Sequence, residues 1–277
     1  MSRPTGRTRR RPGSAPRTRG RAPALLLLPS LLGLSFLVLP VVGLLERTPW
    51  REFTADLSAG DSWTALRLSL ECATAATGVS LLFGVPLAWL LARTELPGRG
   101  LARALVMVPL VLPPVVGGMA LLLMFGRNGV LGIYLDRWFG LTLPFTTPGV
   151  VMAETFVAMP FLVVSVETAL RALEPDIEEA AATSGADTWQ TFRYITLPNL
   201  LPAIGAGAVL SWARALGEFG ATITFAGDFP GTTQTMPLAV YLAFQEDPQS
   251  AMVLSVVLLA VSVTILAALR DRLFTRV

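Results

Sequence analysis

Two charged residues lie within a long apolar part of the sequence and are the first candidates for chemistry. Arg214 and Glu218 are four residues apart, so on a helix both side chains lie on one face. Because a charge is costly in lipid, both should face other helices or a water-filled cavity. The arginine could present positive potential to a passing oxyanion while the glutamate orients it, or the two could form a structural ion pair. The sequence leaves both interpretations open.

Hydroxyl groups surround this pair at Ser211, Thr222 and Thr224. They could donate hydrogen bonds to an oxyanion without holding it tightly, as a conduit requires, or the threonines could bond to their own helix. Prolines and glycines lie earlier in the chain. They either mark a pathway wall, where a broken backbone is tolerated beside a cavity, or produce a simple kink. These residues are Pro109, Pro113, Pro114, Gly117 and Gly118.

The composition excludes several kinds of enzyme site. Among 277 residues there is no His and no Lys, all 22 basic residues are Arg, and Cys72 is the single cysteine. A P-loop and a Schiff base both need lysine, and a Ser-His-Asp triad needs histidine. A lone cysteine forms neither an intrachain disulfide nor a CxxC metal site. We therefore expect no catalytic residues and no metal site on this chain. A membrane-embedded enzyme would need paired carboxylates or serine chemistry. The sequence shows no such set in the middle of a predicted span.

Hydropathy indicates an all-α integral membrane protein. Hydrophobic residues make up 53% of the chain, charged residues only 15%, and the mean hydropathy is +0.60, whereas ordinary soluble domains are roughly 25% charged. Six apolar segments are long enough to cross a bilayer. The first exceeds a typical signal-peptide core and lacks a cleavage site after it, so we expect it to be retained. The six segments are residues 24–45, 72–92, 104–126, 150–170, 194–213 and 248–269.

Other stretches lack a clear span pattern. Residues 219–245 are predicted to be a helix end followed by an irregular segment, because glycine, proline and aspartate interrupt them. Glu71, Glu154 and Glu167 lie near the ends of the predicted spans and are expected at the membrane interface rather than in a proton relay.

The arginines predict the orientation. Eight of them precede residue 22, with no acid among them, which suggests a disordered basic arm over residues 1–22 that lies against anionic lipid. When six spans are threaded from an inside N-terminus, sixteen arginines fall inside and five lie at or near the outer face. By the positive-inside rule, both termini are cytoplasmic.

The longest inside loop, residues 171–199, is predicted to form two short helices around a glycine. Pro175 fits the first turn of the first helix, and Gly185 can take the left-handed conformation that ends it. Asp187 or Thr188 can cap a second helix over residues 189–195. An alanine-rich helix of this kind is a smooth knob suited to a groove on another protein, although it could also be a connector on the membrane surface.

Small residues recur every four positions in the fifth predicted span. Such a stripe lets another helix approach closely, either within the bundle or at a homodimer contact. Its members are Ala203, Gly207, Ser211 and Ala215.

The loop carries a spaced motif that resembles the EAA loop of bacterial ABC importer permeases, which in that family docks into the ATPase subunit. All seven motif positions match: Glu179, Ala180, Ala181, Gly185, Ile195, Leu197 and Pro198. Three further segments, 108–118, 213–225 and 230–241, are similar to the molybdate permease branch. The similarity covers about residues 62–270. The basic arm and first span depart from the shorter five-span molybdate permeases.

The resemblance implies a permease with the MetI-like fold that passes molybdate, or tungstate, inward by alternating access. It implies a homodimer, a dimer of ATPase subunits that hold ATP and Mg, and an extracytoplasmic molybdate-binding protein. No cofactor on this chain and no nucleic-acid partner are expected. Sulfate permeases share the Gly-Glu-Phe-Gly element at residues 217–220, so a sulfate or thiosulfate permease is the alternative. An ion-coupled secondary transporter is a further alternative, but it would need ionisable groups deep in the spans.

The expected organisation follows from these observations. Residues 1–22 form the arm, residues 23–61 the first span and an outer loop, residues 62–270 the permease domain, and residues 271–277 a cytoplasmic tail. We expect a multi-pass protein of the bacterial inner membrane, surrounded by lipid. The pathway candidates are Pro113, Pro114, Gly117, Ser211, Arg214, Glu218, Thr222 and Thr224.

Overall fold

The computed structural model describes the chain except residues 1–23, 52, 55–61, 96 and 275–277. The expected basic arm over residues 1–22 and the end of the expected C-terminal tail lie outside the described residues. The chain divides into two units, residues 1–46 and residues 47–277. The described part of the first unit is helix α1 (Ala24–Arg47), an apolar helix of 24 residues that contains Pro29 and Pro40.

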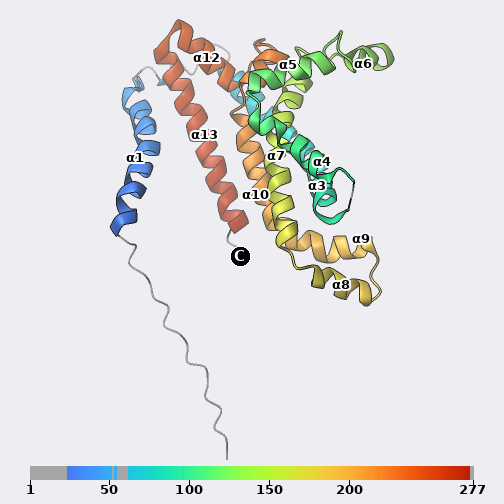
Figure 1. Ribbon diagram of the computed structural model, residues 1–277. Helices are drawn as coiled ribbons and strands as arrows, with labels where there is room; N and C mark the ends of the chain where they lie inside the picture. Colours follow the sequence, from blue (N-terminus) through green and yellow to red (C-terminus); the bar gives the residue numbers. More distant parts are fainter. Residues whose placement is uncertain (1–23, 52, 55–61, 96, 275–277) are drawn as a thin grey trace, which may run out of the picture. The chain divides into compact units, whose positions relative to one another are not determined.

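The second unit contains four long helices, which are α3 (Ser62–Arg93), α7 (Thr147–Ala172), α10 (Leu197–Leu216) and α13 (Pro248–Phe274). Helix α13 lies to one side of the other three, against α10 and α12 (Met236–Glu246) (Figure 1). Helix α3 packs along α7, and α10 packs against both. Within the described residues, five helices are long and apolar enough to cross a membrane, or six if one bent pair counts as a span. This agrees with the prediction of about six spans.

The interior is built from small side chains that allow the helices to approach closely. Ala73, Ala76, Ala158 and Ala215 are fully buried in one cluster with Trp212. The predicted stripe of small residues on α10 faces α7. A Cβ added at Gly207 would lie 2.9 Å from the Leu162 side chain, and the Ser165 hydroxyl donates to the Ala203 carbonyl at 3.2 Å. Of the two expected uses of this stripe, the structure shows packing within the bundle.

The segment expected to be a single span over residues 104–126 is broken in two. Helix α4 (Arg99–Val111) and helix α5 (Pro114–Phe125) meet at an angle of 118°. Consecutive prolines at 113 and 114 lack backbone donors, and a residue before proline is driven to extended backbone. Leu112 accordingly ends α4 in an extended conformation. The single span expected over residues 104–126 is therefore two helices joined by a sharp break.

Residues 219–245 contain two helices, so the expectation of an irregular segment beyond a helix end was wrong for its second half. Helix α11 (Gly220–Phe225) is short, whereas α12 (Met236–Glu246) has 11 residues and packs against α13. The Met236 amide donates to the buried Ser69 hydroxyl of α3 at 2.6 Å. This tertiary anchor, together with the burial of Met236 and Leu238, fixes where α12 begins.

The remaining helices lie at the two ends of the bundle (Figure 1). Helix α6 (Gly132–Phe139) and α12 are at one end. At the other end lie α8 (Pro175–Thr183), α9 (Thr188–Thr191) and the π-helical turn η1 (Phe192–Thr196), which continues directly into α10.

Candidate functional site

Helix α8 ends in a glycine-centred turn, as the sequence predicted. The Ala186 amide donates to the Ala181 carbonyl and the Gly185 amide to the Ala182 carbonyl, which is the Schellman pattern. Gly185 has φ +92°, in the left-handed region that favours glycine. The chain can therefore leave α8 abruptly and turn back beside it.

The second helix of the loop is shorter than expected, although its cap is as predicted. The Gln190 amide donates to the Asp187 carboxylate at 2.7 Å, and the Asp187 amide donates to the Gln190 side chain at 3.1 Å, forming a capping box. Helix α9 then passes into η1 rather than continuing as an α-helix to residue 195. Together α9, η1 and α10 form one helical rod over residues 188–216.

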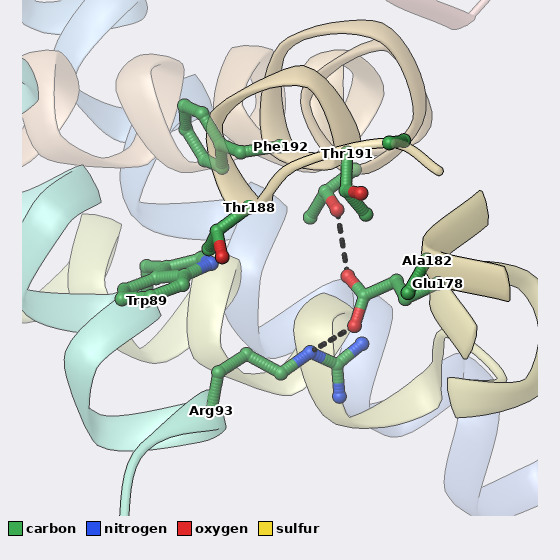
Figure 2. A pocket seen from close by; sticks show the side chains of 9 residues that line it. Trp89, Arg93, Glu178, Ala182, Thr188, Thr191 and Phe192 are labelled. Carbon is green, nitrogen blue, oxygen red and sulfur yellow. Dashed lines mark hydrogen bonds and ion pairs between the residues drawn. The ribbon is translucent and has the colours of Figure 1, made fainter. Parts of the chain in front are cut away.

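A polar contact joins α8 to the bundle through Glu178 (Figure 2). One Glu178 oxygen lies 3.0 Å from the Nε of Arg93, at the end of α3. The other accepts a hydrogen bond from the Thr196 hydroxyl of η1 at 2.6 Å. The Arg93 guanidinium also donates to the Leu173 carbonyl in the connection between α7 and α8. This contact could not be predicted from local spacing, because Arg93 lies 85 positions before Glu178 in the sequence. The only local signal at Glu178 was an acidic residue in the first turn of α8.

These residues border a cavity of about 260 Å³ between α3, α8 and α9 (Figure 2). Trp89 and Phe192 form its apolar side, with rings in an edge-to-face arrangement at 6.3 Å. Arg93 and Glu178 form its charged side. Apolar packing therefore does not fill the space between α8 and the end of α3, and the ion pair spans it.

The motif residues divide by exposure. Glu179, Ala180 and Gly185 are exposed on α8 and its turn, whereas Ala181 is buried against the bundle side. Of the later motif residues, Ile195 and Leu197 are half-buried and Pro198 is exposed. The face of α8 that carries Glu179 and Ala180 is thus open within this chain.

A second charged cluster lies between α4 and α7 at the same end of the bundle. The Glu167 carboxylate is 5% exposed and is paired with Arg103 at 2.7 Å and with Arg171 at 2.9 Å. Its place at the membrane interface stays a prediction, while the side chain is enclosed by protein. The signal that could have revealed this was the i, i+4 spacing of Glu167 and Arg171.

At the other end of α7, the predicted pair of Arg214 and Glu218 forms an ion pair of 2.6 Å. Glu218 is 1% exposed, and its second oxygen accepts a hydrogen bond from the Ala221 amide, at the start of α11. Glu154 is also 1% exposed and interacts electrostatically with Glu218. The Glu218 carboxylate is thus held by Arg214 and by a backbone amide, which favours the structural interpretation of the Arg214 pair.

The expected hydroxyl donors differ in their partners. The Thr224 hydroxyl donates to the Gly220 carbonyl of its own helix at 2.8 Å. Among the described residues, the hydroxyls of Ser211 and Thr222 are fully buried and have no hydrogen-bond partner. One buried Glu154 oxygen also has none there. These three atoms lie in α7, α10 and α11, and a buried polar atom without a partner costs free energy.

The expected pathway residues of the broken span lie beside α11. A Cβ added at Gly118 would lie 2.7 Å from the Ala221 carbonyl oxygen, so the two backbones are nearly in contact. Gly117 is buried against Phe156 of α7. Pro113 is exposed and Pro114 is half-buried. The break thus places α5 against α11. Helix α11 begins two residues after Glu218 of the Arg214 and Glu218 pair.

Comparisons with solved structures support the fold. A bacterial alginate ABC transporter bound to its periplasmic protein contains a chain that superposes with a TM-score of 0.68 at 21% identity, covering 90% of this chain and 93% of that chain. The MetNI methionine ABC transporter gives a TM-score of 0.58 at 17% identity, with 76% and 93% covered. At these identities the likeness shows the fold alone, and it agrees with the predicted all-α permease fold.

Sequence comparisons identify relatives of higher identity than these solved structures. The molybdenum transport system permease protein ModB of Mycobacterium tuberculosis is 44% identical over 252 residues, 90% of this chain and 94% of that protein. ModB of Escherichia coli is 46% identical over 183 residues, 66% of this chain and 80% of that protein. The sulfate transport system permease protein CysT of Escherichia coli is 37% identical over 237 residues, 85% of this chain and 84% of that protein.

The profile of the family described as "Binding-protein-dependent transport system inner membrane component" matches residues 84–276. That range contains α4 to α13, including the loop with the exposed Glu179 and the broken span. This chain therefore belongs to the family of inner membrane components of binding-protein-dependent transport systems.

Proposed function

We propose that this chain is the permease subunit of an ABC importer that brings molybdate into the cell. The observation that carries the proposal is the 44% identity to a molybdenum transport permease across 90% of the chain. The similarity to a sulfate permease is lower, at 37% across 85% of the chain. Sulfate transport is therefore the second candidate. Tungstate matches molybdate in charge and closely in size, and the extracytoplasmic binding protein would make most of the selection.

ATP hydrolysis resides on a partner chain in this proposal. The chain has no lysine and therefore no P-loop of its own. The exposed face of α8, with Glu179 and Ala180, is the surface that would enter a groove of the ATPase. Gly185 gives the loop its turn, and Ile195, Leu197 and Pro198 carry it into α10. ATP and Mg bind to the ATPase dimer, and no cofactor is needed on the permease.

The proposed orientation places α8 and both termini in the cytoplasm, as the excess of arginines on that side suggests. It can be tested with single cysteines. In a Cys72→Ser background, we expect Ser184→Cys to react with a membrane-impermeant maleimide in inside-out vesicles but not in intact cells. An extracellular position for the α8 turn would reverse this pattern and would also remove α8 from reach of an ATPase.

The proposed pathway runs beside the broken span. In the structure α5 packs against α11, and the candidates Pro113, Pro114 and Gly117 lie at this junction. The junction would open and close between transport states. Ser211 and Thr222 would supply unused hydroxyl donors to a passing oxyanion. Arg214 and Glu218 would hold the end of α10 and the start of α11 together, and Thr224 would stabilise α11. A second copy of the chain would complete the pathway in a homodimer surrounded by lipid.

The decisive experiment uses the complete complex in proteoliposomes with its ATPase and binding protein. We expect the binding protein loaded with molybdate to stimulate ATP hydrolysis and uptake of the anion, and tungstate to act similarly. The same binding protein without ligand provides the baseline. Stimulation by sulfate alone would overturn the molybdate assignment in favour of the second candidate. Uptake driven by an ion gradient without the ATPase would overturn the ABC mechanism itself.

A further inference from the structure

We propose that Arg93 and Glu178 form the link by which movement of α8 reaches α3, making them positioning residues for the coupling of ATP hydrolysis to transport. The inference rests on the proposed function, because it takes the exposed face of α8 as the ATPase contact. It goes beyond the family motif, because neither residue is one of its matched positions.

Helix α8 is a separate short rod between two non-helical joints. Leu173 and Glu174 are extended where the chain enters it, and the left-handed Gly185 lies where the chain leaves. Its main helix contacts are with α9 and η1. A push on its exposed face would therefore rotate it about these joints unless side chains tie it to the bundle.

The Glu178 carboxylate makes that tie in two directions. One oxygen pairs with Arg93 on α3, and the other accepts from Thr196, where η1 passes into α10. One side chain of α8 thus contacts two of the long helices or their direct extensions. Because α3 and α10 both pack against α7, a movement of Glu178 acts on the centre of the bundle.

The pair is enclosed enough to transmit force. The side chains of Arg93 and Glu178 are 17% and 20% exposed, so their attraction is screened less than that of a surface pair. Beside the pair lies the cavity of about 260 Å³, so apolar side chains do not fill this part of the space between α8 and the end of α3 among the described residues (Figure 2). Removing either charge leaves its partner half-buried without a counter-ion.

Two adjacent glutamates therefore have different tasks. Glu179 is exposed and available to the partner, whereas Glu178 points inward to Arg93 and Thr196. This division gives the proposal its sharpest test, because neutralising one residue or the other should impair different steps. Neutralising Glu179 should weaken binding of the ATPase to the permease. Neutralising Glu178 should leave that binding intact but reduce the amount of anion taken up per ATP hydrolysed.

The test measures the anion taken up per ATP hydrolysed by the complete reconstituted complex. We expect Arg93→Gln and Glu178→Gln each to lower this ratio about tenfold, the effect of losing one charged contact, while the ATPase still copurifies in full amount. Arg93→Lys, which keeps the charge, should recover part of the ratio. The matched control is Arg67→Gln, which removes an exposed ion pair with Glu71 on the same helix and should leave the ratio unchanged.

A charge-swapped double variant distinguishes a role in coupling from a purely structural role. If Arg93 and Glu178 act through each other, Arg93→Glu combined with Glu178→Arg should restore more coupling than either change alone retains. The proposal is overturned if the two neutral variants keep the wild-type ratio, or if their loss of uptake follows only the amount of assembled complex. Failure of the proposed function would instead appear in the wild-type complex, as no response to any loaded binding protein.

Discussion

Buried glutamates near the two ends of α7 differ in how fully they are paired. Near α8, one carboxylate, Glu167, is shared by Arg103 and Arg171. Near α11, Glu218 pairs with Arg214, and one buried oxygen of Glu154 has no hydrogen-bond partner among the described residues. The first cluster is satisfied in the structure as it stands. The second is not, so the two ends differ in how fully these glutamates are paired.

The largest effect is expected from breaking the Arg214 pair. Arg214→Leu leaves the Glu218 carboxylate, 1% exposed, without its counter-ion. We expect a loss of about 3 kcal/mol in the free energy of unfolding, measured by denaturant titration in detergent. The control Arg67→Leu removes an exposed pair that water and salt screen, so it should cost much less. Equal costs for both changes would mean that the second cluster is solvated like the surface.

The next variants test the contrast between the two ends of α7 directly. Glu167→Gln leaves Arg103 and Arg171 facing each other, and we expect a loss of about 2 kcal/mol, because both arginines are partly exposed. Glu154→Gln replaces a fully buried carboxyl group, one oxygen of which has no hydrogen-bond partner among the described residues, by a neutral amide, so it should be neutral or stabilising. The comparison fails if Glu154→Gln is the more destabilising change in the same titration.

A third variant tests the close contact between α5 and α11. Gly118→Ala places a methyl group 2.7 Å from the Ala221 carbonyl oxygen, which cannot move without shifting α11. We expect a cost of about 1 to 3 kcal/mol and a shift of the transport rate. Gly78→Ala on α3 is the control, because nothing lies within 4 Å of its added methyl group and alanine favours helix. A Gly118→Ala protein as stable as the control would show that the junction yields easily.

The smallest expected effect is at the turn after α8. Gly185→Ala forces an L-residue into a left-handed conformation in otherwise open space, at a cost of about 1 kcal/mol. Because α8 is held by few contacts, we expect the change to appear as weaker ATPase binding in a pull-down titration rather than as global unfolding. A drop in thermal stability with unchanged ATPase binding would contradict this view of the loop.

Much of the fold followed from local patterns in the sequence. Apolar length predicted the long helices, and the glycine at 185 and the aspartate at 187 predicted the two caps of the loop, because these effects act within one turn of the chain. The prolines at 113 and 114 marked the broken span but not its 118° angle, which depends on how α5 meets α11. Helix α12 was missed because a distant hydroxyl, Ser69, fixes its start.

The charged contacts of the candidate site were harder to foresee. A local spacing of four residues revealed the Arg214 and Glu218 pair. The link between Arg93 and Glu178 depends on the meeting of two helix ends that are remote in sequence. Burial of Glu154 and Glu167 depends likewise on which face of α7 is covered by other helices. Hydropathy reports how apolar a segment is, but not which neighbour its few polar residues will meet.

The π-helical turn η1 makes the length of the loop as important as its composition. A π turn holds one residue more than an α-helical turn. Deleting one residue between 192 and 196 would let the rod run on as a regular α-helix. Everything on the α9 side would then rotate by about 100° relative to α10. The exposed face of the loop would then point in another direction although its residues were unchanged. The length of the chain in this turn therefore sets the direction from which the proposed ATPase would bind.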